Sequence, residues 1–332
     1  MPHLPDGFIV AKVGLITILQ SREYMSTKWV TVMGSFVADL AFRTDKLPAW
    51  GETFMGRSFQ LGPGGKGSNQ AVAAARAGAP VSFISKLGND PFGDLARATY
   101  HTEGIDTRHL LRTTTPTGAA AIILDANSGE NAIIVVPGAC FELTPQELED
   151  MTDLIAASAI FVTQLELALP TVEHGLALAR FLNVPTILNP APACKLPASI
   201  FPNCDFVTPN ETEAEGLTGV HVADLNGAER AADAFLALGV RNAVITLGAN
   251  GVFVKNASTA AHVPAFNAGP VVETTGAGDA FNGGFAVALA EGMDILQAAR
   301  FGCAVAGISV TRPGTAPSMP HRPEIDALLK QT

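Results

Sequence analysis

The sequence is short of positive charge and of paired cysteines. Its 21 Lys and Arg residues are outnumbered by 31 Asp and Glu residues, which gives a net charge of -10 without long runs of one sign. A nucleic-acid-binding surface needs an excess of basic side chains, so this balance argues against a nucleic-acid partner. The four cysteines form neither a C-x-x-C pair nor a metal-ligand pattern. This spacing predicts reduced thiols that serve as small core residues in a cytoplasmic protein.

Long hydrophobic runs are also missing. Residues 7–19 are apolar, but Asp6 precedes them and Lys12 interrupts them. The run is too short to span a membrane, and no clear small-x-small cleavage site follows it. We therefore expect no membrane partner, and we treat residues 1–28 as an N-terminal extension of unknown role.

What the sequence does contain is 48% apolar residues, arranged in alternating strand-like and helix-like segments. The pattern predicts strands at residues 29–36, 81–88, 159–164, 185–188, 205–207 and 243–247, and helices at 71–77, 94–103, 169–183, 228–238 and 280–290. Such alternation is typical of a parallel sheet between two layers of helices. We expect one main α/β domain of this three-layer αβα class at residues 29–332.

A second, smaller sheet is predicted beside the main one. Residues 41–61 are broken by Pro48 and Gly51 and alternate around a short polar and apolar stretch. Residues 117–125 and 131–136 flank a hairpin-like turn. Together these strands would form a lid, with its segments at about 38–64 and 115–137.

The glycine-rich turn at residues 62–70 admits two interpretations. Its glycines match the G-x-G-x-x-G pattern of NAD-binding folds, and Asp90 follows at about the distance expected for a ribose contact. The match is weak, because the turn does not close the first strand of a βαβ unit. Alternatively, its backbone N–H groups, with Lys66 and an amide side chain, hold a polyhydroxy ligand or a phosphate.

A second glycine-rich turn, at residues 274–284, opens a helix of small residues and carries Asp279 at its mouth. A helix N-terminus favours negative charge, so phosphate oxygens would be stable there. Asp279 could instead accept a proton from an attacking hydroxyl, as the catalytic Asp of kinases does. A turn that only caps a core helix would have the same sequence pattern.

Polar residues recur where the predicted strands end. Asp39 follows the first strand, and later strands are followed by Gln164, Glu166, Asn189, Asn210, Glu211, Glu213, Thr246 and Gly248. Ligands of open α/β sheets bind at the carboxyl ends of the strands, so these side chains are expected to converge on one crevice. Several carboxylates there would suit a Mg²⁺ ion held partly through water.

Two signatures and four blocks carry a family resemblance. Gly-Gly-Lys-Gly-Ser-Asn at 64–69 and Glu-x-x-Gly-Ala-Gly-Asp at 273–279 resemble the two signatures of the PfkB sugar-kinase family. The blocks at 164–166, 189–193, 209–215 and 245–248 resemble those of its ribokinase branch, in the same order. The resemblance covers residues 29–329 and implies a ribokinase-like fold.

The resemblance also implies an activity and its residues. It implies transfer of a phosphoryl group from ATP to the 5-hydroxyl of a pentose, D-ribose first, with Asp279 as the base. The anion hole would be formed by the N–H groups of Gly276, Ala277 and Gly278. The pentose would contact Asp39, Gly65, Lys66, Asn69, Glu166 and Asp279.

The same resemblance implies sites for ATP and ions. ATP would contact Asn210, Thr246, Gly248, Gly251, Gly278 and Cys303. Asn210 and Glu213 would belong to the Mg²⁺ and phosphate motif. A monovalent cation, usually K⁺, would bind through Glu273, Thr275, Ser309, Arg312, Gly314 and Ser318. A cytoplasmic homodimer joined through the lids is expected.

Two positions depart from the family pattern. Val37 stands where ribokinases often have Asn, and an apolar side chain cannot form a hydrogen bond with a 2-hydroxyl group. A kinase for 2-deoxyribose, or for another sugar of the PfkB family, is therefore an alternative. Glu273 stands where the family usually has Asp, and its longer side chain would shift the cation or weaken its binding.

Two other classes of protein remain as alternatives. An NAD-dependent oxidoreductase rests only on the glycine pattern at 62–67. A non-catalytic sugar sensor would need the binding loop but no base, so the presence of Asp279 argues against it.

Overall fold

The computed structural model describes residues 29–127 and 130–331, so the predicted extension at residues 1–28 lies outside the described part. The main sheet has nine described strands in the order β13-β12-β11-β10-β9-β8-β1-β4-β5. They are β1 (Val30–Met33), β4 (Val81–Gly88), β5 (Leu110–Thr113), β8 (Ile160–Thr163), β9 (Thr186–Leu188), β10 (Phe206–Val207), β11 (Asn242–Thr246), β12 (Val252–Lys255) and β13 (Ala260–Val263). All neighbours are parallel except at β12, which is antiparallel to both β11 and β13.

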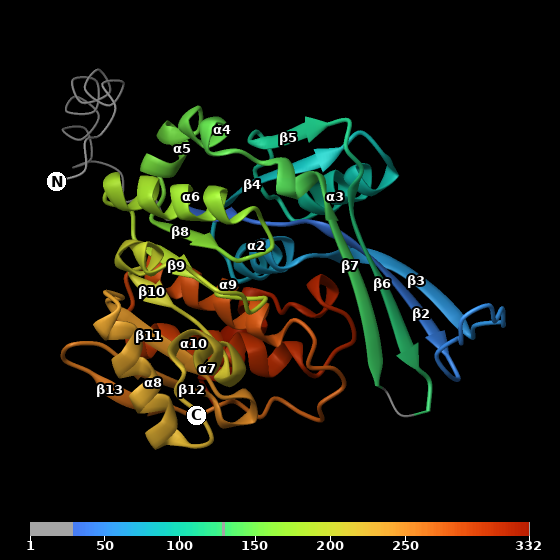
Figure 1. The fold of residues 1–332 in the computed structure, drawn as a ribbon. Helices are drawn as coiled ribbons and strands as arrows, with labels where there is room; N and C mark the ends of the chain where they lie inside the picture. Colours follow the sequence, from blue (N-terminus) through green and yellow to red (C-terminus); the bar gives the residue numbers. More distant parts are fainter. Residues whose placement is uncertain (1–28, 128–129, 332) are drawn as a thin grey trace.

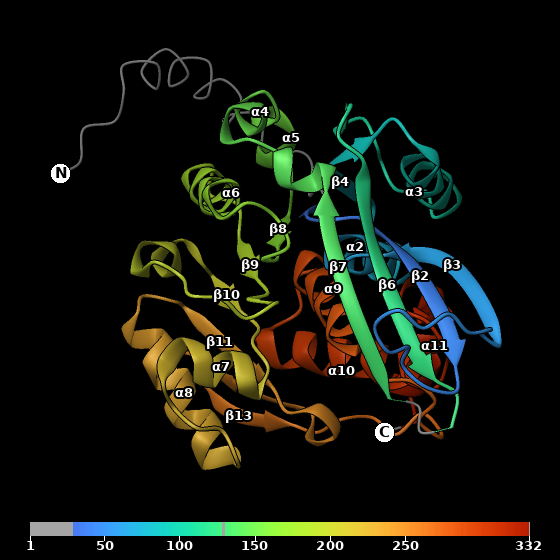
Figure 2. The ribbon, with the colours of Figure 1, turned by 45° about the vertical axis from the view of Figure 1, so that its right-hand side comes forward.

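Helices cover both faces of this sheet (Figures 1 and 2). One layer contains α2 (Lys66–Arg76), α3 (Pro91–Thr102), α9 (Ala277–Ala290), α10 (Ile295–Ser309) and α11 (Arg322–Leu329). The other contains α4 (Pro145–Glu149), α5 (Thr152–Ala156), α6 (Leu169–Phe181), α7 (Glu211–Thr218) and α8 (Leu225–Ala237). The predicted three-layer α/β fold is confirmed.

Alternation along the central strands divides the core in two. On β1, Val30 and Val32 pack with the α2, α9 and α10 layer, whereas Met33 packs with the α6 and α8 layer. On β8, Ile160 packs in the first layer and Phe161 in the second. Successive side chains of a strand point to opposite faces, so the central strands of a sheet covered on both sides are buried at every position and are mostly apolar.

The lid is a separate four-stranded sheet in the order β3-β2-β6-β7, and it projects from the main body (Figure 1). Its strands are β2 (Val37–Thr44), β3 (Ser58–Gly64), β6 (Thr117–Asp125) and β7 (Asn131–Gly138). The β2–β6 pair is parallel and the other two pairs are antiparallel. The small second sheet is thus confirmed, but the stretch predicted as short strands forms only the two strands β2 and β3, and residues 45–57 between them are not a strand.

Some elements differ from the sequence prediction. The helix predicted at 71–77 begins at Lys66, because Gly65 takes the left-handed φ of 88° needed to start it earlier. The strands β5, β12 and β13 and the helices α5, α7, α10 and α11 were not predicted. In the described part of the chain, no helix is both long enough and apolar enough to cross a membrane.

Small residues bring α2 and α9 into close contact. A Cβ atom on Gly283 would lie 2.5 Å from the Cβ of Ala73 and 2.8 Å from the carbonyl oxygen of Gln70. On the other side of α9, a Cβ on Gly284 would lie 2.6 Å from Val305. Only glycine fits at these positions, and the resulting contact places the two glycine-rich turns next to each other.

Replacing Gly283 by Ala should therefore destabilise the protein. The added methyl group overlaps α2 and forces the two helices apart, at a cost of about 1–3 kcal/mol in the free energy of unfolding measured by urea denaturation. The matched control is Gly216→Ala in α7, where an added Cβ has no neighbour within 4 Å. The control should leave stability unchanged or raise it by up to about 1 kcal/mol through helix propensity. Equal effects of the two substitutions would contradict this account of the contact.

Candidate active site

The start of α9 forms the centre of the candidate site. Gly276 is the N-cap residue, with a left-handed φ of 83°, and Asp279 is the third residue of the helix. The N–H of Ala277 donates to the carbonyl oxygen of Thr274 at 3.1 Å. Because Gly278 lies in the first turn, its N–H has no partner within the helix. Of the three predicted anion-hole N–H groups, that of Ala277 is therefore engaged with Thr274, and those of Gly276 and Gly278 stay the expected donors.

The Asp279 carboxylate is buried and is held by two amides from α2. Asn69 Nδ2 donates to Asp279 Oδ2 at 3.0 Å, and Gln70 Nε2 donates to Asp279 Oδ1 at 3.0 Å. The nearby carboxylate of Asp279 is the main reason that the pKa of Lys66 is raised, although burial acts in the opposite direction. Lys66 is thus a stable cation beside the carboxylate.

The Asn69 side chain has one polar atom that makes no hydrogen bond within the described part of the chain. Its Oδ1 atom is buried and has no hydrogen-bond partner among the described residues. A buried acceptor without a partner carries a free-energy cost, which a hydroxyl group of a ligand would remove. The Asn69 amide therefore donates to Asp279 through its nitrogen and leaves its oxygen for a hydroxyl donor of a ligand.

The predicted sugar-binding residues come together under the lid. Glu166 accepts a hydrogen bond from the backbone N–H of Lys66 at 2.8 Å and another from the Ser35 hydroxyl. Asp39, on β2, pairs with Gly62 of β3, and its side chain reaches diagonally to Gly64, where a Cβ atom would lie 2.2 Å from Asp39 Oδ2. Glycine at this position of the first signature therefore makes room for an acid on the neighbouring strand.

The surroundings of the Asp39 carboxyl group disfavour its ionised form. Burial, followed by the nearby Glu166 carboxylate, raises its pKa from 3.8 to about 6. The carboxylates of Asp279 and Glu273 act in the same direction, and a hydrogen bond from Thr315 opposes them. Thr315 Oγ1 lies 3.5 Å from Asp39 Oδ2. A ligand that donates hydroxyl groups to Asp39 would favour its ionised form.

A cavity of about 170 Å³ lies beside Asp279. It is lined by Lys66, Asn189, Ala191, Thr208, Asn210, Glu213, Thr246, Gly276, Gly278, Asp279 and Asn282. Of the residues predicted to contact ATP, this cavity includes Asn210, Thr246 and Gly278. Gly248, Gly251 and Cys303 do not line it.

The other predicted nucleotide residues have structural roles of their own. Gly248 and Gly251 form the tight turn between β11 and β12, and a Cβ on Gly251 would lie 2.1 Å from the carbonyl oxygen of Val263. Cys303 is buried on α10, and burial raises the pKa of its thiol to about 12. It is therefore a neutral core residue, as predicted for the cysteines and as also found for Cys140 and Cys204. The prediction was wrong for Cys194, which is exposed in the loop after β9.

Asn210 and Glu213 begin helix α7. The Asn210 side chain accepts from the N–H of Glu213, and the Glu213 carboxylate accepts from the N–H of Asn210, at 2.8 and 2.9 Å. Burial raises the pKa of Glu213, and the charge of Lys66 opposes this effect. Among the described residues, no three His, Cys, Asp or Glu side chains form a cluster suited to a metal.

The predicted cation residues are partly engaged with one another. Glu273 accepts from the N–H of Gly314 at 2.8 Å. Arg312 pairs with Glu324, and Ser318 donates to the carbonyl oxygen of Thr315 at 2.7 Å. Ser309 donates within α10, to the carbonyl oxygen of Ala306, and Thr275 is exposed. The structure thus joins Glu273 directly to the loop that contains Gly314 and Ser318.

Helix α2 also fixes this loop. Arg76 donates to the carbonyl oxygens of Ala316, Pro317 and Met319 at 2.9–3.3 Å, while its other nitrogens pair with Glu103. Helix α2 therefore supplies residues that are expected to contact the sugar, and it also holds the loop that contacts Glu273.

Sequence reasoning missed three polar residues that support the site. Gln70 contacts Asp279, as described above. Thr208 donates to Asn282 Oδ1 at 2.6 Å, and Asn282 Nδ2 donates to the carbonyl oxygen of Gly278 at 2.8 Å. The signal for Asn282 was present, because it is the one polar side chain in residues 280–290.

The dinucleotide-binding interpretation is wrong. The turn at 62–70 follows β3 of the lid rather than the first strand of the main sheet. Asp90 is the N-cap of α3, where it accepts from the N–H of Gly93 at 2.8 Å and from the N–H of Thr117 at 2.7 Å. Its carboxylate is therefore occupied in joining α3 to the lid and does not contact a ribose.

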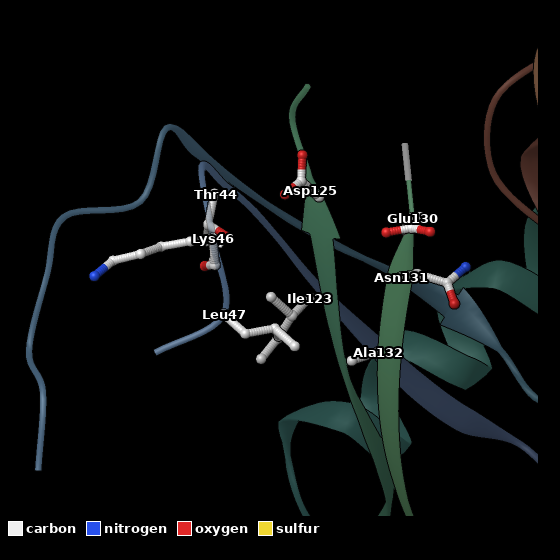
Figure 3. Close-up of a pocket in the computed structure, with 8 residues that line it drawn as sticks. All are labelled: Thr44, Lys46, Leu47, Ile123, Asp125, Glu130, Asn131 and Ala132. Atoms are coloured by element: carbon white, nitrogen blue, oxygen red, sulfur yellow. Dashed lines mark hydrogen bonds between the residues drawn. The ribbon is translucent and has the colours of Figure 1, made fainter. Parts of the chain in front are cut away.

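A larger hollow, of about 650 Å³, lies at the tip of the lid (Figure 3). Thr44, Lys46 and Leu47 line one side, and residues of β6 and β7 line the other together with Glu130, which precedes β7. The ammonium group of Lys46 points away from the hollow, as Figure 3 shows, and pairs with Glu52. The hollow contains none of the residues that meet at Asp279, so its size does not mark the active site.

Comparisons with known proteins agree with this geometry. Residues 27–322 match the model of the pfkB family carbohydrate kinases. A ribokinase of Haemophilus influenzae is 42% identical over 297 residues, covering 90% of this chain and 97% of that protein. A deoxyribokinase of Salmonella typhi is 36% identical over 302 residues, covering 90% and 98%. The structure of an Arabidopsis thaliana ribokinase with ribose and ATP has a TM-score of 0.87 at 31% identity, covering 92% and 99%.

The fold and the site are therefore those of a sugar kinase, a phosphotransferase that acts on a hydroxyl group. The chain belongs to the pfkB family of carbohydrate kinases.

The raised pKa of Asp39 predicts a gain in stability on its neutralisation. The folded state holds the Asp39 proton more tightly than the unfolded state, so the ionised group weakens folding above pH 6 and has no such effect below its unfolded pKa of 3.8. Asp39→Asn should thus raise the free energy of unfolding at pH 8 by about 1–3 kcal/mol. The gain should shrink as the pH falls from 6 to 4.

Urea denaturation of the ligand-free protein at pH 8 and pH 4 would measure this difference. Asp153→Asn, at an exposed acid of α5, is the control and should give no comparable gain. A gain for Asp39→Asn that is the same at both pH values would contradict the assigned cause.

Proposed function

We propose that the chain transfers the γ-phosphoryl group of ATP to the 5-hydroxyl of a pentose, with D-ribose as the preferred substrate. The observation that supports this most strongly is Asn69, which contacts Asp279 through one end of its amide and has a buried, unpartnered acceptor at the other. Further polar groups for sugar hydroxyls come from Asp39, Lys66 and Glu166. Relatives of this chain include a ribokinase solved with ribose and ATP.

In this proposal Asp279 is the base. It accepts the proton of the 5-hydroxyl as the oxygen forms a bond to the γ-phosphorus and the bond from phosphorus to the bridging oxygen breaks, so that ADP leaves. Gly276 and Gly278 lie at the start of α9, where their N–H groups and the helix dipole would stabilise the charge on the transferred group. Lys66 would supply the nearest positive side-chain charge.

The ATP phosphates and Mg²⁺ would occupy the cavity next to Asp279. Asn210 and Glu213 line it, but their side-chain oxygens already cap α7. This arrangement fits an ion held through water, since Mg²⁺ loses its water ligands reluctantly. Mg²⁺ would neutralise phosphate charge, while this chain's own residues hold the ATP phosphates and the sugar in line.

An activating K⁺ would bind between the start of α9 and the loop at 309–318. Glu273 fits this role because its carboxylate accepts a hydrogen bond from the N–H of Gly314. Gly314 belongs to the loop that Arg76 also holds. The ion would supply positive charge behind the anion-binding turn, and the loop would supply carbonyl oxygens, which suit such cations.

A kinase for 2-deoxyribose is the second candidate, because of Val37. Val37 lies two residues before Asp39 on β2, so both side chains point to the same face of the strand. Val37 is buried and has no polar group for a 2-hydroxyl. A relative at 36% identity is a deoxyribokinase.

The test is steady-state kinetics with a sugar panel, ATP and Mg²⁺, with and without K⁺. We expect ADP release with ribose, a higher kcat in K⁺, and a ratio of kcat/KM for ribose to that for 2-deoxyribose above one. Val37→Asn should raise that ratio at least about tenfold, which corresponds to one hydrogen bond of about 1.4 kcal/mol. A wild-type ratio below one would favour the deoxyribose kinase, and no turnover with any pentose or hexose would contradict the proposal.

We further infer that the protein is a cytoplasmic homodimer joined through the lids. All four central residues of β7, Ile133–Val136, are exposed and apolar, and they alternate between the two faces of a sheet with no helix layer of its own. Phe42 and Phe59 form a further exposed apolar pair on β2 and β3. A sugar covers only part of one face, so a second lid is the partner that fits the rest. Free cysteines support a reducing compartment.

Light scattering coupled to size-exclusion chromatography would test the dimer. The wild type should have twice the chain mass, and Ile134→Glu with Val136→Lys should convert it to a monomer, because charges would be buried in the lid contact. Leu225→Lys, at an exposed apolar residue of α8 far from the lid, should remain dimeric. A monomeric wild type would refute the inference.

A further inference from the structure

Behind Asp279 lies a row of three buried amide side chains from three different elements. Gln70 is on α2, Gln164 follows β8 and Asn189 follows β9. Gln70 and Gln164 are fully buried, and Asn189 is 7% exposed. Asn189 also lines the cavity, but Gln70 and Gln164 do not, and buried amides of that kind need a reason, because a polar group without a partner is costly.

The hydrogen bonds of this row run in one direction. Asn189 Nδ2 donates to the carbonyl oxygen of Thr208 at 3.1 Å. Asn189 Oδ1 therefore faces Gln70, whose Nε2 donates to it at 3.1 Å. Gln70 Oε1 in turn accepts from Gln164 Nε2 at 2.6 Å.

The direction is set by a group that cannot be reversed. A backbone carbonyl only accepts, so Asn189 must present its nitrogen to Thr208 and its oxygen to Gln70. Gln70 must then present its nitrogen to Asn189, and this same nitrogen lies 3.0 Å from Asp279 Oδ1. With its oxygen turned towards Asp279 instead, Gln70 would place acceptor against acceptor at both contacts.

We propose that Gln70 is a positioning residue for the reaction: its amide holds the Asp279 carboxylate in one orientation, and the chain from Thr208 through Asn189 to Gln164 fixes which end of that amide faces the carboxylate. The inference rests on the proposed role of Asp279 as the base. Asn69 holds the other carboxylate oxygen and keeps a buried, unpartnered Oδ1 for a ligand hydroxyl, whereas both ends of the Gln70 amide are engaged by Asp279, Asn189 and Gln164. Gln70 acts on the reaction only through Asp279.

The geometry explains why a second amide is useful. One hydrogen bond leaves a carboxylate free to rotate about its Cβ–Cγ bond, and two bonds to its two oxygens fix its plane. Asp279 interacts electrostatically with Lys66 on α2, Asp39 on β2 and Glu213 on α7. Two of the three repel the carboxylate, so neutral donors at fixed positions are needed to hold it in place.

The key variant is Gln70→Met, which keeps the volume and removes the amide. We expect kcat to fall at least tenfold, while KM for sugar and ATP and the dissociation constant for the sugar, from calorimetry, change less than threefold. Thr31→Val is the control for stability, because it removes a buried hydrogen bond to Ser158 on the same sheet, away from Asp279. It should lower the melting temperature without lowering kcat.

Gln164→Met supplies a second test, and one that remains if Gln70→Met does not fold. Gln164 makes no contact with Asp279, so it should reduce kcat less than Gln70→Met does. In the double variant, kcat should equal that of Gln70→Met alone, because Gln164 acts through Gln70.

The outcomes separate the inference from the proposed function. If the wild type turns over and Gln70→Met has an unchanged kcat, the inference is overturned and the kinase assignment stands. The same conclusion follows if the losses in the double variant are strictly additive. If Gln70→Met does not fold, an unchanged kcat in Gln164→Met overturns it. No sugar-dependent ADP release by the wild type would instead overturn the proposed function.

Discussion

The site depends on the contact between α2 and α9. Each helix begins at a glycine-rich turn, and each turn supplies half of the site: α2 brings Lys66, Asn69 and Gln70, and α9 brings Asp279. The two halves meet only because Gly283 lets the helices approach more closely than any side chain would allow. The small-residue composition of α9 is thus a requirement of the site, since a larger residue would separate the carboxylate from the amides that hold it.

The second constraint is electrostatic. Glu166, Glu213 and Asp279 act on the cation Lys66, and the pKa of Asp39 is raised first by burial and then by the carboxylates of Glu166, Asp279 and Glu273. Such a cluster weakens the ligand-free fold and suits a ligand with many hydroxyl donors, together with positive ions. A substrate of that kind satisfies the acids that the empty protein leaves unbalanced.

Much of this could be predicted from the sequence. The alternation of strands and helices indicated the layers, and the glycine-rich turns indicated where α2 and α9 begin. The prediction failed for elements whose conformation depends on contacts with distant parts of the chain. The edge strand β13 is mostly exposed and has no clear apolar period, whereas the apolar run of β12 was overlooked. Helix α10 is apolar over most of its surface because it is buried between other elements. Its capping box at Asp294 was the available signal.

The role of individual polar residues was harder to predict for the same reason. Asn69 was predicted to hold the sugar, but its second contact, with Asp279, joins residues 210 positions apart and leaves no local pattern. Gln70 sits in an alanine-rich run and has the spacing of a core residue. Only the fold shows that its neighbours are amides from two other strands.

The most direct measurement of the central claim compares Asp279→Asn with the wild type. The account predicts that calorimetry finds sugar binding within a few-fold of the wild type, because Asn has the same shape, while turnover falls by at least about a thousandfold for loss of the base. A variant that binds the sugar and keeps a kcat near that of the wild type would contradict the account.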